Sequence, residues 1–362
     1  MGKTYIIAEA GVNHNGDIQK AKLLIDIAVK AKVNAVKFQT FITENVISIH
    51  APKAEYQLTN TGSENSQYEM VKQLELGFEQ FRELKLYSEN QGIDFLSTPF
   101  DIESADFLID ELKLTVIKIP SGEITNAPLI YHIAKKKVKI ILSTGMSTLG
   151  EIEQALSVIA YGYLGNDELP SIQAFKEAYI SVEGQAKLRE KVTLLHCTTE
   201  YPAPIREVNL NVMHTLQKSF DLNVGYSDHT EGITVPIAAV ALGAVILEKH
   251  ITYDKHAEGP DHIASLSPNE LEEMVVSIRK VEESLGSTIK MPTTSEIKNI
   301  VIARKSITAQ KEISKNELFS EENITIKRPG SGVSPFCYWE LLNTSSSKKY
   351  EVDEKIDKND SY

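Results

Sequence analysis

The sequence predicts an α/β protein, a closed (β/α)8 barrel followed by a small β-rich domain. Short runs rich in β-branched and aliphatic residues recur along the first 250 residues, with amphipathic segments such as 18–32 and 234–243 between them. Alternating strand and helix signals are typical of a parallel sheet, and eight such units closed on themselves form a TIM barrel. The expected strands are 4–10, 35–40, 93–99, 115–121, 138–144, 192–198, 222–228 and 244–250.

The main alternative fold is an open, doubly wound sheet. That fold would place a glycine-rich phosphate turn directly after the first strand. The stretch "EAGVNHNG" is a poor match to GxGxxG. The closed barrel is therefore favoured.

The alternation of strand and helix signals ends near residue 285. We expect the barrel over residues 1–285 and a linker over 286–300, because "STIKMPTTSEIKN" is polar and lacks a strong period. Residues 301–358 have short strand and turn signals but no long helical pattern, which predicts a separate small β-rich domain.

Composition narrows the class of protein. Of 362 residues, 42% are hydrophobic and 24% charged, as in globular enzymes with a large core. The net charge of −12 argues against nucleic-acid binding, which needs a clustered basic surface. The two cysteines, Cys197 and Cys337, form no CxxC pair, and we find neither a signal peptide nor a membrane span. We expect a cytoplasmic protein without membrane or nucleic-acid partners.

Every expected strand carries polar residues at or near its carboxyl end. In a barrel of this kind the chemistry lies at these ends, whereas residues deeper in each strand fill the interior. We therefore expect one polar site at the mouth of the barrel. Its candidates are Glu9, Lys37, Gln39, Thr98, Lys118, Ser121, Glu123, Ser143, His196, Thr198, Ser227, His229 and His250.

His229 and His250 follow or end the seventh and eighth strands, which are neighbours in a barrel. Two neutral imidazoles with open positions for water or substrate suit a divalent cation such as Mn²⁺, Fe²⁺ or Zn²⁺. The alternative is that each histidine only hydrogen-bonds a neighbour.

The lysines and hydroxyls of the mouth predict an anion site. Lys37 and Lys118 with Thr98, Ser121, Ser143 and Ser227 could donate to a phosphate and a carboxylate at once. Lys37 could instead act as a Schiff-base nucleophile. Glu9 suits a general base, although Glu9 or Glu123 could simply pair with a lysine. The Gly259–Pro260 turn would aim Asp261 at the mouth.

A series of ordered motifs resembles one family along essentially the whole chain. "IIAEAGVNHNGD", "AVKFQT", "STPFD", "KIPSGE", "ILSTGM", "LLHCTTEYPAP", "GYSDHT", "EKHIT" and "GPDH" resemble the landmarks of the sialic acid synthases. "KRPGSG" near the carboxyl end is similar to the antifreeze-like (SAF) domain of those proteins. One departure is Thr199, where some members carry asparagine.

The resemblance implies a transferase that condenses phosphoenolpyruvate with the aldehyde of a 2-acetamido-mannose-type sugar, giving a nine-carbon α-keto acid and phosphate. It implies a domain-swapped homodimer, in which Arg328 of the partner subunit reaches the sugar. The implied roles are phosphoenolpyruvate binding by Lys37, Thr98, Lys118, Ser121, Ser143 and Ser227; a divalent metal, usually Mn²⁺, on His229 and His250; sugar contacts from Gln39, Glu123, Tyr201 and Asp261; and acid/base catalysis by Glu9.

The identity of the sugar is the least determined part. "HCTTEYPAP", "VGYSDHTEGI" and "MPTTSE" resemble the legionaminic acid branch, which uses 2,4-diacetamido-2,4,6-trideoxymannose. N-acetylneuraminate synthase is the nearest alternative and pseudaminate synthase a remoter one. Two other classes stay open: a Schiff-base pyruvate aldolase using Lys37, and a carbohydrate-binding protein with an inert barrel.

Overall fold

The computed structural model describes residues 2–55, 57–58, 66–165 and 169–360. The chain divides into two compact units, Met1–Gly286 and Ser287–Tyr362. We describe each unit by itself.

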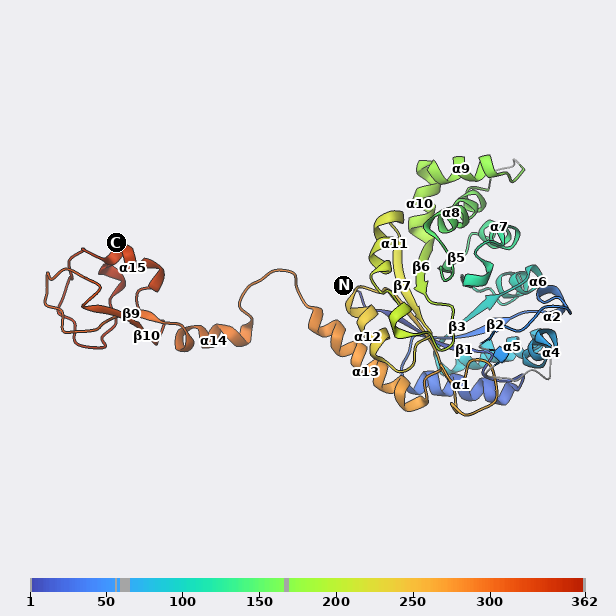
Figure 1. Cartoon of the computed structure of the whole chain (residues 1–362), viewed down its shortest axis with the longest axis horizontal. Coiled ribbons are helices and arrows are strands. Elements are labelled where there is room, and N and C mark those ends of the chain that lie inside the picture. Colours follow the sequence, from blue (N-terminus) through green and yellow to red (C-terminus); the bar gives the residue numbers. More distant parts are fainter. Residues whose placement is uncertain (1, 56, 59–65, 166–168, 361–362) are drawn as a thin grey trace. The chain divides into compact units, whose positions relative to one another are not determined.

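The first unit is an eight-stranded parallel barrel, which confirms the predicted fold of this part (Figure 1). Hydrogen-bonded neighbours follow the order β3-β2-β1-β8-β7-β6-β5-β4, and the end strands β3 and β4 contact each other. The strands are β1 Tyr5–Gly11, β2 Ala35–Thr40, β3 Asp94–Pro99, β4 Val116–Ile119, β5 Lys139–Ser143, β6 Val192–Cys197, β7 Asn223–Asp228 and β8 Ile246–His250.

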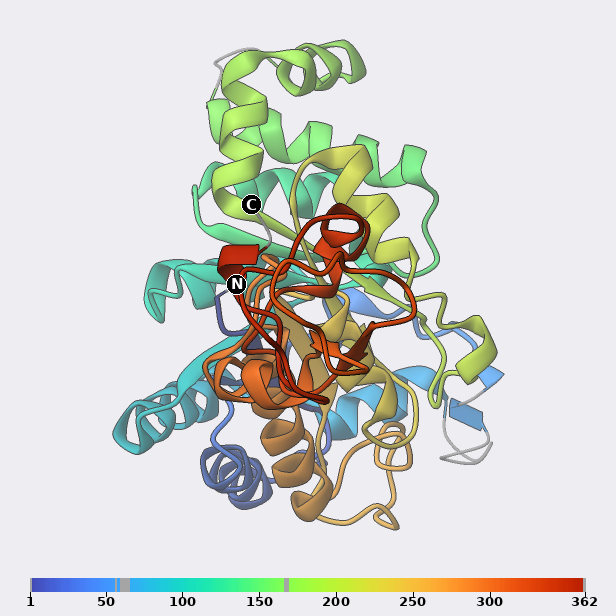
Figure 2. The same cartoon turned by 90° about the vertical axis from the view of Figure 1, so that its left-hand side faces the viewer.

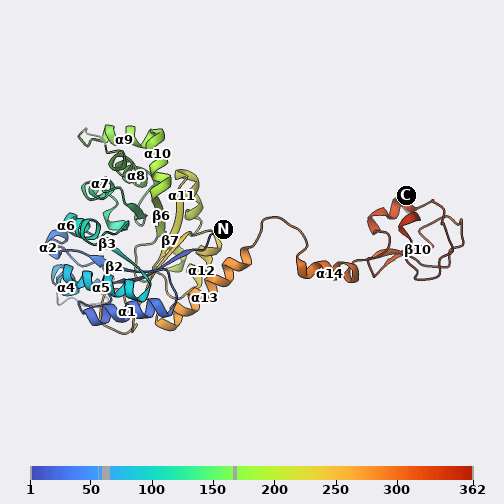
Figure 3. The same cartoon turned by 180° about the vertical axis from the view of Figure 1, so that it is seen from behind.

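Helices surround the strands and cover their outer face (Figures 1 and 3). α1 contacts both α5 and α13, while α9 and α10 pack on α8 at one end of the unit (Figure 2). The helices are α1 Ile18–Lys30, α2 Thr43–Val46, α4 Gln67–Leu74, α5 Phe78–Gln91, α6 Ile102–Asp106, α7 Ala127–Lys135, α8 Leu149–Leu164, α9 Ile172–Ile180, α10 Val182–Lys191, α11 Val212–Phe220, α12 Thr234–Ala241 and α13 Pro268–Leu285.

Local sequence explains where several of these helices begin. Thr148 and Glu151 form a capping box at the start of α8, and Ser267 and Glu270 form one at the start of α13. Each box satisfies backbone N–H groups that the first helical turn leaves without partners. The main core lies between the strands and these helices, so the strands are buried on both faces.

The second unit has its own small core, which includes Ile307, Phe319, Ile324 and Tyr350. Its elements are α14 Thr294–Ala303, the antiparallel pair β9 Ser306–Ala309 and β10 Ile324–Lys327, and α15 Tyr338–Leu341.

One feature of the second unit differs from the expectation. Residues 294–300, expected as part of an irregular linker, begin α14, because Thr293 and Glu296 form a capping box. The carboxyl-terminal tail is held by Asp360, whose carboxylate accepts hydrogen bonds from Ser347 N and the Tyr350 hydroxyl.

Among the described residues, no helix has both the length and the apolar character needed to span a membrane.

Candidate active site

Two layers of side chains fill the barrel interior, and each residue of the upper layer lies two positions after a residue of the lower layer. The lower layer is a cluster that includes Ile7, Ala35, Leu96, Val116, Ile141, Leu195 and Ile246. Gly225 completes this layer on β7, where a Cβ atom would lie 2.7 Å from Leu195 Cδ2. Because side chains two apart share a face of a strand, the next layer toward the carboxyl ends is Glu9, Lys37, Thr98, Lys118, Ser143, Cys197, Ser227 and Glu248.

This upper layer lines a cavity of about 270 Å³. Of the residues that the sequence predicted, the structure brings together Glu9, Lys37, Gln39, Thr98, Lys118, Ser121, Ser143, Tyr201, Ser227, His229, His250 and Asp261 around this cavity.

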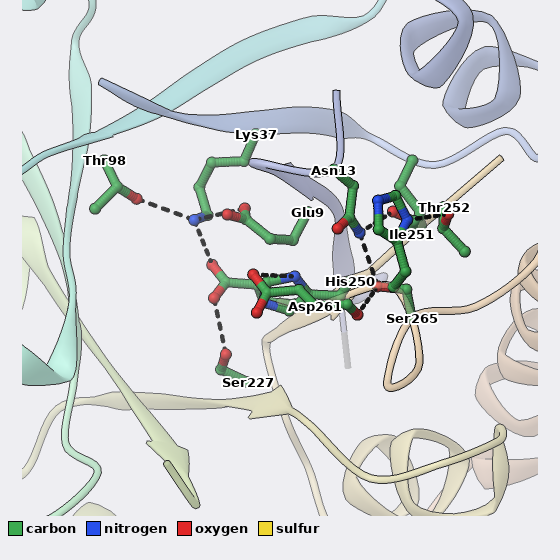
Figure 4. Close-up of polar contacts among 12 residues, drawn as sticks. Glu9, Asn13, Lys37, Thr98, Ser227, His250, Ile251, Thr252, Asp261 and Ser265 are labelled. Carbon is green, nitrogen blue, oxygen red and sulfur yellow. Dashed lines mark hydrogen bonds and ion pairs between the residues drawn. The ribbon is translucent and has the colours of Figure 1, made fainter. Parts of the chain in front are cut away.

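Lys37 is the centre of a buried ion-pair network (Figure 4). Its Nζ lies 2.6 Å from Glu9 Oε2 and 3.4 Å from Glu248 Oε2, and it donates a 3.0 Å hydrogen bond to Thr98 Oγ1. Lys118 Nζ lies 3.1 Å from Glu248 Oε1, to which Ser227 Oγ also donates at 2.8 Å. Two cations and two carboxylates therefore balance one another in the barrel interior.

The two carboxylates differ in their protonation. Burial alone would raise the pKa of Glu248, but Lys118, Lys37 and the Ser227 hydrogen bond outweigh it and hold the pKa well below its usual value. Burial raises the pKa of Glu9 to about 7, against the pull of Lys37. Glu248 thus stays ionised, whereas Glu9 can hold or release a proton near neutral pH.

The Lys37 amine is held as an ammonium ion. Burial alone would lower the pKa of Lys37, but Glu248 and Glu9 outweigh burial and raise it. A Schiff-base nucleophile must be a free amine, which this environment disfavours.

Hydroxyl groups line a second side of the cavity. Within the described part of the chain, the buried atoms Ser143 Oγ and Thr199 Oγ1 have no hydrogen-bond partner. Gly145 N donates to Ser121 Oγ at 3.0 Å, and a Cβ at Gly145 would lie 2.3 Å from Thr199 Oγ1. Glycine therefore lets the backbone approach these hydroxyls closely, and unpartnered buried donors are the groups that an entering anion would satisfy.

The two predicted histidines are neighbours at the mouth. The ring centroids of His229 and His250 lie 5.5 Å apart, and Tyr201 packs against both rings at 4.2 and 5.6 Å. His229 Nδ1 lies 2.6 Å from the Thr198 carbonyl oxygen, which can only accept, so Nδ1 carries the proton and Nε2 keeps its lone pair.

Both imidazoles are neutral. Burial lowers the pKa of His229 to about 4, and burial together with His229 lowers the pKa of His250 well below its usual value. His250 Nδ1 is buried without a hydrogen-bond partner among the described residues, and it lies 3.9 Å from Asp261 Oδ2. Neutral imidazoles with free lone pairs fit a divalent metal.

The set of ligands that the protein offers is incomplete. The described residues hold no cluster of three or more histidine, cysteine, aspartate or glutamate side chains suited to a metal. A metal held by His229 and His250 would therefore leave positions for water or substrate, as catalytic sites require.

Asp261 is the second carboxyl group with a raised pKa in this site. Burial raises its pKa to about 7. The segment after β8 that carries Asp261 is held through its backbone. Ser265 Oγ donates to Asp261 O at 2.6 Å, and Asn13 Nδ2 donates to Ser265 Oγ at 2.9 Å (Figure 4).

Some predicted site residues do not line this cavity. Glu123 does not line the cavity, and its carboxylate accepts a 2.6 Å hydrogen bond from Asn126 Nδ2. Arg328 belongs to the second unit, where its Nε donates to Ala303 O at 3.1 Å. Of the other strand-end candidates, His196 donates to the Val208 carbonyl oxygen at 2.7 Å and does not line this cavity.

Sequence reasoning missed Glu248, although it contacts both lysines. The signal was present, because Glu248 lies two residues before His250 and so shares its face of β8. Cys197 was not predicted as a site residue either, but its Sγ lies 3.2 Å from Ser121 Oγ.

The fold and the site are those of an α/β-barrel enzyme, in which the polar groups lie at the carboxyl ends of the strands. Residues 24–290 match the model of the NeuB family. The chain belongs to the NeuB family, which confirms the family predicted from its motifs.

Relatives at high identity cover nearly the whole chain. The N,N'-diacetyllegionaminic acid synthase of Campylobacter jejuni is 51% identical over 98% of this chain and 99% of its own length. The protein of the same name from Legionella pneumophila is 44% identical, over 91% of this chain and 87% of its own. A structure of N-acetylneuraminic acid synthetase from Leptospira borgpetersenii, in complex with citrate, has a TM-score of 0.66 at 33% identity, covering 83% of this chain and 90% of that one.

Proposed function

We propose that this protein is an N,N'-diacetyllegionaminate synthase, which condenses phosphoenolpyruvate with 2,4-diacetamido-2,4,6-trideoxymannose. The observation that supports it best is the combination of groups at the mouth of the barrel. Two buried lysines and buried hydroxyls without hydrogen-bond partners lie there beside two neutral imidazoles. The names of the two relatives above support the choice of sugar.

Phosphoenolpyruvate occupies the anionic part of the cavity in this proposal. Lys37 and Lys118 supply positive charge, and hydroxyls of Thr98, Ser121, Ser143 and Ser227 donate hydrogen bonds to phosphate and carboxylate oxygens. The two buried carboxylates that now balance the lysines make this arrangement stable before the ligand arrives. When an anion joins them, the added negative charge favours the protonated form of Glu9.

His229 and His250 hold a divalent metal in the proposal, with Mn²⁺ as the expected ion. When bound, such an ion supplies Lewis-acid polarisation of the aldehyde oxygen of the sugar. Gln39, Tyr201 and Asp261 line the cavity and contact the sugar, and Tyr201 also buttresses both imidazole rings.

The proposed reaction forms one C–C bond and one C–O bond, the latter from water, and breaks the C–O bond to phosphate. Carbon 3 of phosphoenolpyruvate bonds to the aldehyde carbon, and the aldehyde oxygen takes a proton that Glu9, with its pKa of about 7, can supply. Water then adds at carbon 2 and loses one proton, which can restore the proton of Glu9. The C2–O bond to phosphate breaks, and the departing phosphate takes the remaining hydroxyl proton to leave the α-keto acid. By holding both reactants, the cavity contributes through positioning.

The second unit is an SAF domain in this proposal, and the enzyme is a cytoplasmic homodimer. Arg328 then completes the sugar site of the partner's barrel by donating to an amide oxygen. The support is the "KRPGSG" motif and the placement of Arg328 in the unit that holds none of the other site residues.

One experiment separates this proposal from a Lys37 aldolase. The synthase should release phosphate from phosphoenolpyruvate only when a sugar is present, lose activity in EDTA, and form no borohydride-trapped adduct with pyruvate. Activity that survives EDTA together with a trapped adduct on Lys37 would replace the proposal with the aldolase.

A further inference from the structure

The cavity has an apolar side whose role the proposed chemistry leaves unassigned. It consists of Val12, Phe41, Val46, Ile47, Met70, Val71, Leu74 and Phe100. We call these eight residues the apolar wall.

The apolar wall lies on a different side of the mouth from the imidazole pair. Its residues follow β1, β2 and β3 or belong to α2 and α4, within or beside the long connection after β2. In the sheet order, β1 separates β2 and β3 from β8, the strand that His250 ends, and His229 follows β7 beyond it. Of the wall residues, only Val12, which follows β1, comes after a strand that adjoins β8. A ligand that reaches from the imidazole pair across the mouth therefore meets the wall with its far end.

Contacts among its own residues hold the apolar wall in place. Val12, Phe41 and Leu74 form a buried cluster on which Val46, Val71 and Phe100 pack, and the rings of Phe41 and Phe100 meet edge to face at 6.2 Å. Glu75 fixes the start of α2 by accepting hydrogen bonds from Thr43 N at 2.9 Å and Thr43 Oγ1 at 2.6 Å. A preformed apolar surface binds apolar groups without first paying for its own ordering.

Two side-chain amides line the cavity beside the wall. Gln67 Nε2 donates to Gln57 Oε1 at 3.4 Å, and both residues line the same cavity. An amide has one acceptor and two donors, so this edge matches a second acetamido group better than it matches a lone hydroxyl.

We propose that the apolar wall is the specificity-determining surface for the end of the sugar remote from its aldehyde. It takes a methyl group at carbon 6, with an acetamido group at carbon 4 at the glutamine edge, and it disfavours a hydroxyl at carbon 6. A methyl group gains by leaving water against the wall, whereas a hydroxyl there loses hydrogen bonds that these hydrocarbon side chains cannot replace. This inference rests on the proposed function, because it places the aldehyde at the imidazole pair.

The test compares two sugars that differ in one atom, N-acetylmannosamine and its 6-deoxy counterpart. Phosphate release with phosphoenolpyruvate and Mn²⁺ gives kcat/KM for each sugar. We expect the wild type to prefer the 6-deoxy sugar by about 10- to 100-fold, the range in which an apolar pocket rejects an added hydroxyl. Equal use of the two sugars would overturn the assigned role of the wall.

Variants then locate the preference in the wall. The double substitution Val46→Thr/Val71→Thr adds two hydroxyls at nearly constant size, and should lower the preference about tenfold at an unchanged KM for phosphoenolpyruvate. Val276→Thr makes the same change on the exposed surface of α13 and should leave the preference as it was.

The outcomes separate this inference from the function on which it rests. If the double variant turns over both sugars with the wild-type preference, the role assigned to the apolar wall is overturned, while the proposed function stands. A lack of phosphate release with both of these sugars and with 2,4-diacetamido-2,4,6-trideoxymannose overturns the proposed function, and the inference with it.

Discussion

Glu248 contacts both lysines of the proposed anion site through a single carboxylate. It accepts a hydrogen bond from Ser227 Oγ at 2.8 Å, and its two oxygens lie 3.1 Å from Lys118 Nζ and 3.4 Å from Lys37 Nζ. Glu248 thus holds Lys37 and Lys118 in the arrangement that a bound anion would need.

We predict that Glu248→Gln lowers the free energy of unfolding by about 3 to 5 kcal/mol, because it leaves Lys118 buried without its carboxylate. Phosphoenolpyruvate should then raise the melting temperature more in the variant than in the wild type, since the ligand replaces the lost negative charge. Thermal unfolding with and without the ligand measures both effects. Glu44→Gln, which breaks an exposed ion pair with Lys72, is the control. An equal or smaller ligand shift in Glu248→Gln contradicts this role.

His14 predicts a pH dependence of stability. Burial lowers the pKa of His14 to about 4, against the opposing effects of Asp17 and the Gly11 backbone. Between pH 6.5 and pH 4 the unfolded chain binds a proton at this histidine that the folded chain does not. The neutral, buried His14 therefore contributes its full share to the free energy of unfolding above pH 6.5, and this share is lost as the pH falls toward 4.

Between pH 7 and pH 5 the wild type should lose about 2 kcal/mol more unfolding free energy than His14→Gln. Urea denaturation at the two pH values measures the difference. His50→Gln removes an exposed histidine instead and should behave as the wild type does. Parallel losses in all three proteins would show that His14 does not titrate as described.

At the scale of the elements, a buried ion pair holds the end of β7 against β8. Lys249 Nζ lies 2.6 Å from Asp228 Oδ2 and also donates to the Thr230 carbonyl oxygen, and all three residues are fully buried. Thr230 Oγ1 donates to Asp228 Oδ1 at 2.9 Å. These contacts fix Asp228 and Thr230, the two sequence neighbours of His229. They therefore hold the backbone that positions the His229 ring.

Lys249→Met should cost about 3 to 5 kcal/mol of unfolding free energy, because Asp228 keeps a buried charge without its partner. It should also weaken Mn²⁺ binding, measured by calorimetry on folded protein. Lys255→Met breaks a half-exposed ion pair with Glu270 and should cost about 1 kcal/mol or less. Destabilisation with unaltered Mn²⁺ affinity would limit Lys249 to a structural role.

Element patterns explain how far the sequence could predict this molecule. Eight strands were predictable because β-branched runs alternate with amphipathic helices, and the polar residues at the carboxyl ends of these strands located most of the site. Glu248 was not predicted because it lies two residues before His250, which occupies the very end of the same strand. The apolar wall had no such signal, because Val46 and Val71 come from short helices in a long connection where no period places them at the mouth. Lys249 looks like a surface charge in sequence, and only the tertiary pairing with Asp228 explains its burial.

At the scale of the whole molecule, the two units divide the predicted site. Every predicted site residue except Arg328 lies in unit 1. If Arg328 serves the barrel of a partner subunit, then Arg328→Ala and His229→Ala, each inactive alone, should complement each other. After full subunit exchange, about a quarter of the sites in random dimers would hold both intact groups, and activity should recover to that order. No recovery after verified exchange would mean that Arg328 acts within its own chain or not at all.

The most direct test of the central claim is the rate of phosphate release with a choice of sugars. Phosphoenolpyruvate, Mn²⁺ and the protein are combined with 2,4-diacetamido-2,4,6-trideoxymannose, with N-acetylmannosamine, or with the diacetamido sugar that leads to pseudaminate. We predict the highest kcat/KM with the first sugar and a nine-carbon α-keto acid as product by mass spectrometry. A higher kcat/KM with either other sugar, or phosphate release without a new nine-carbon acid, would contradict the account.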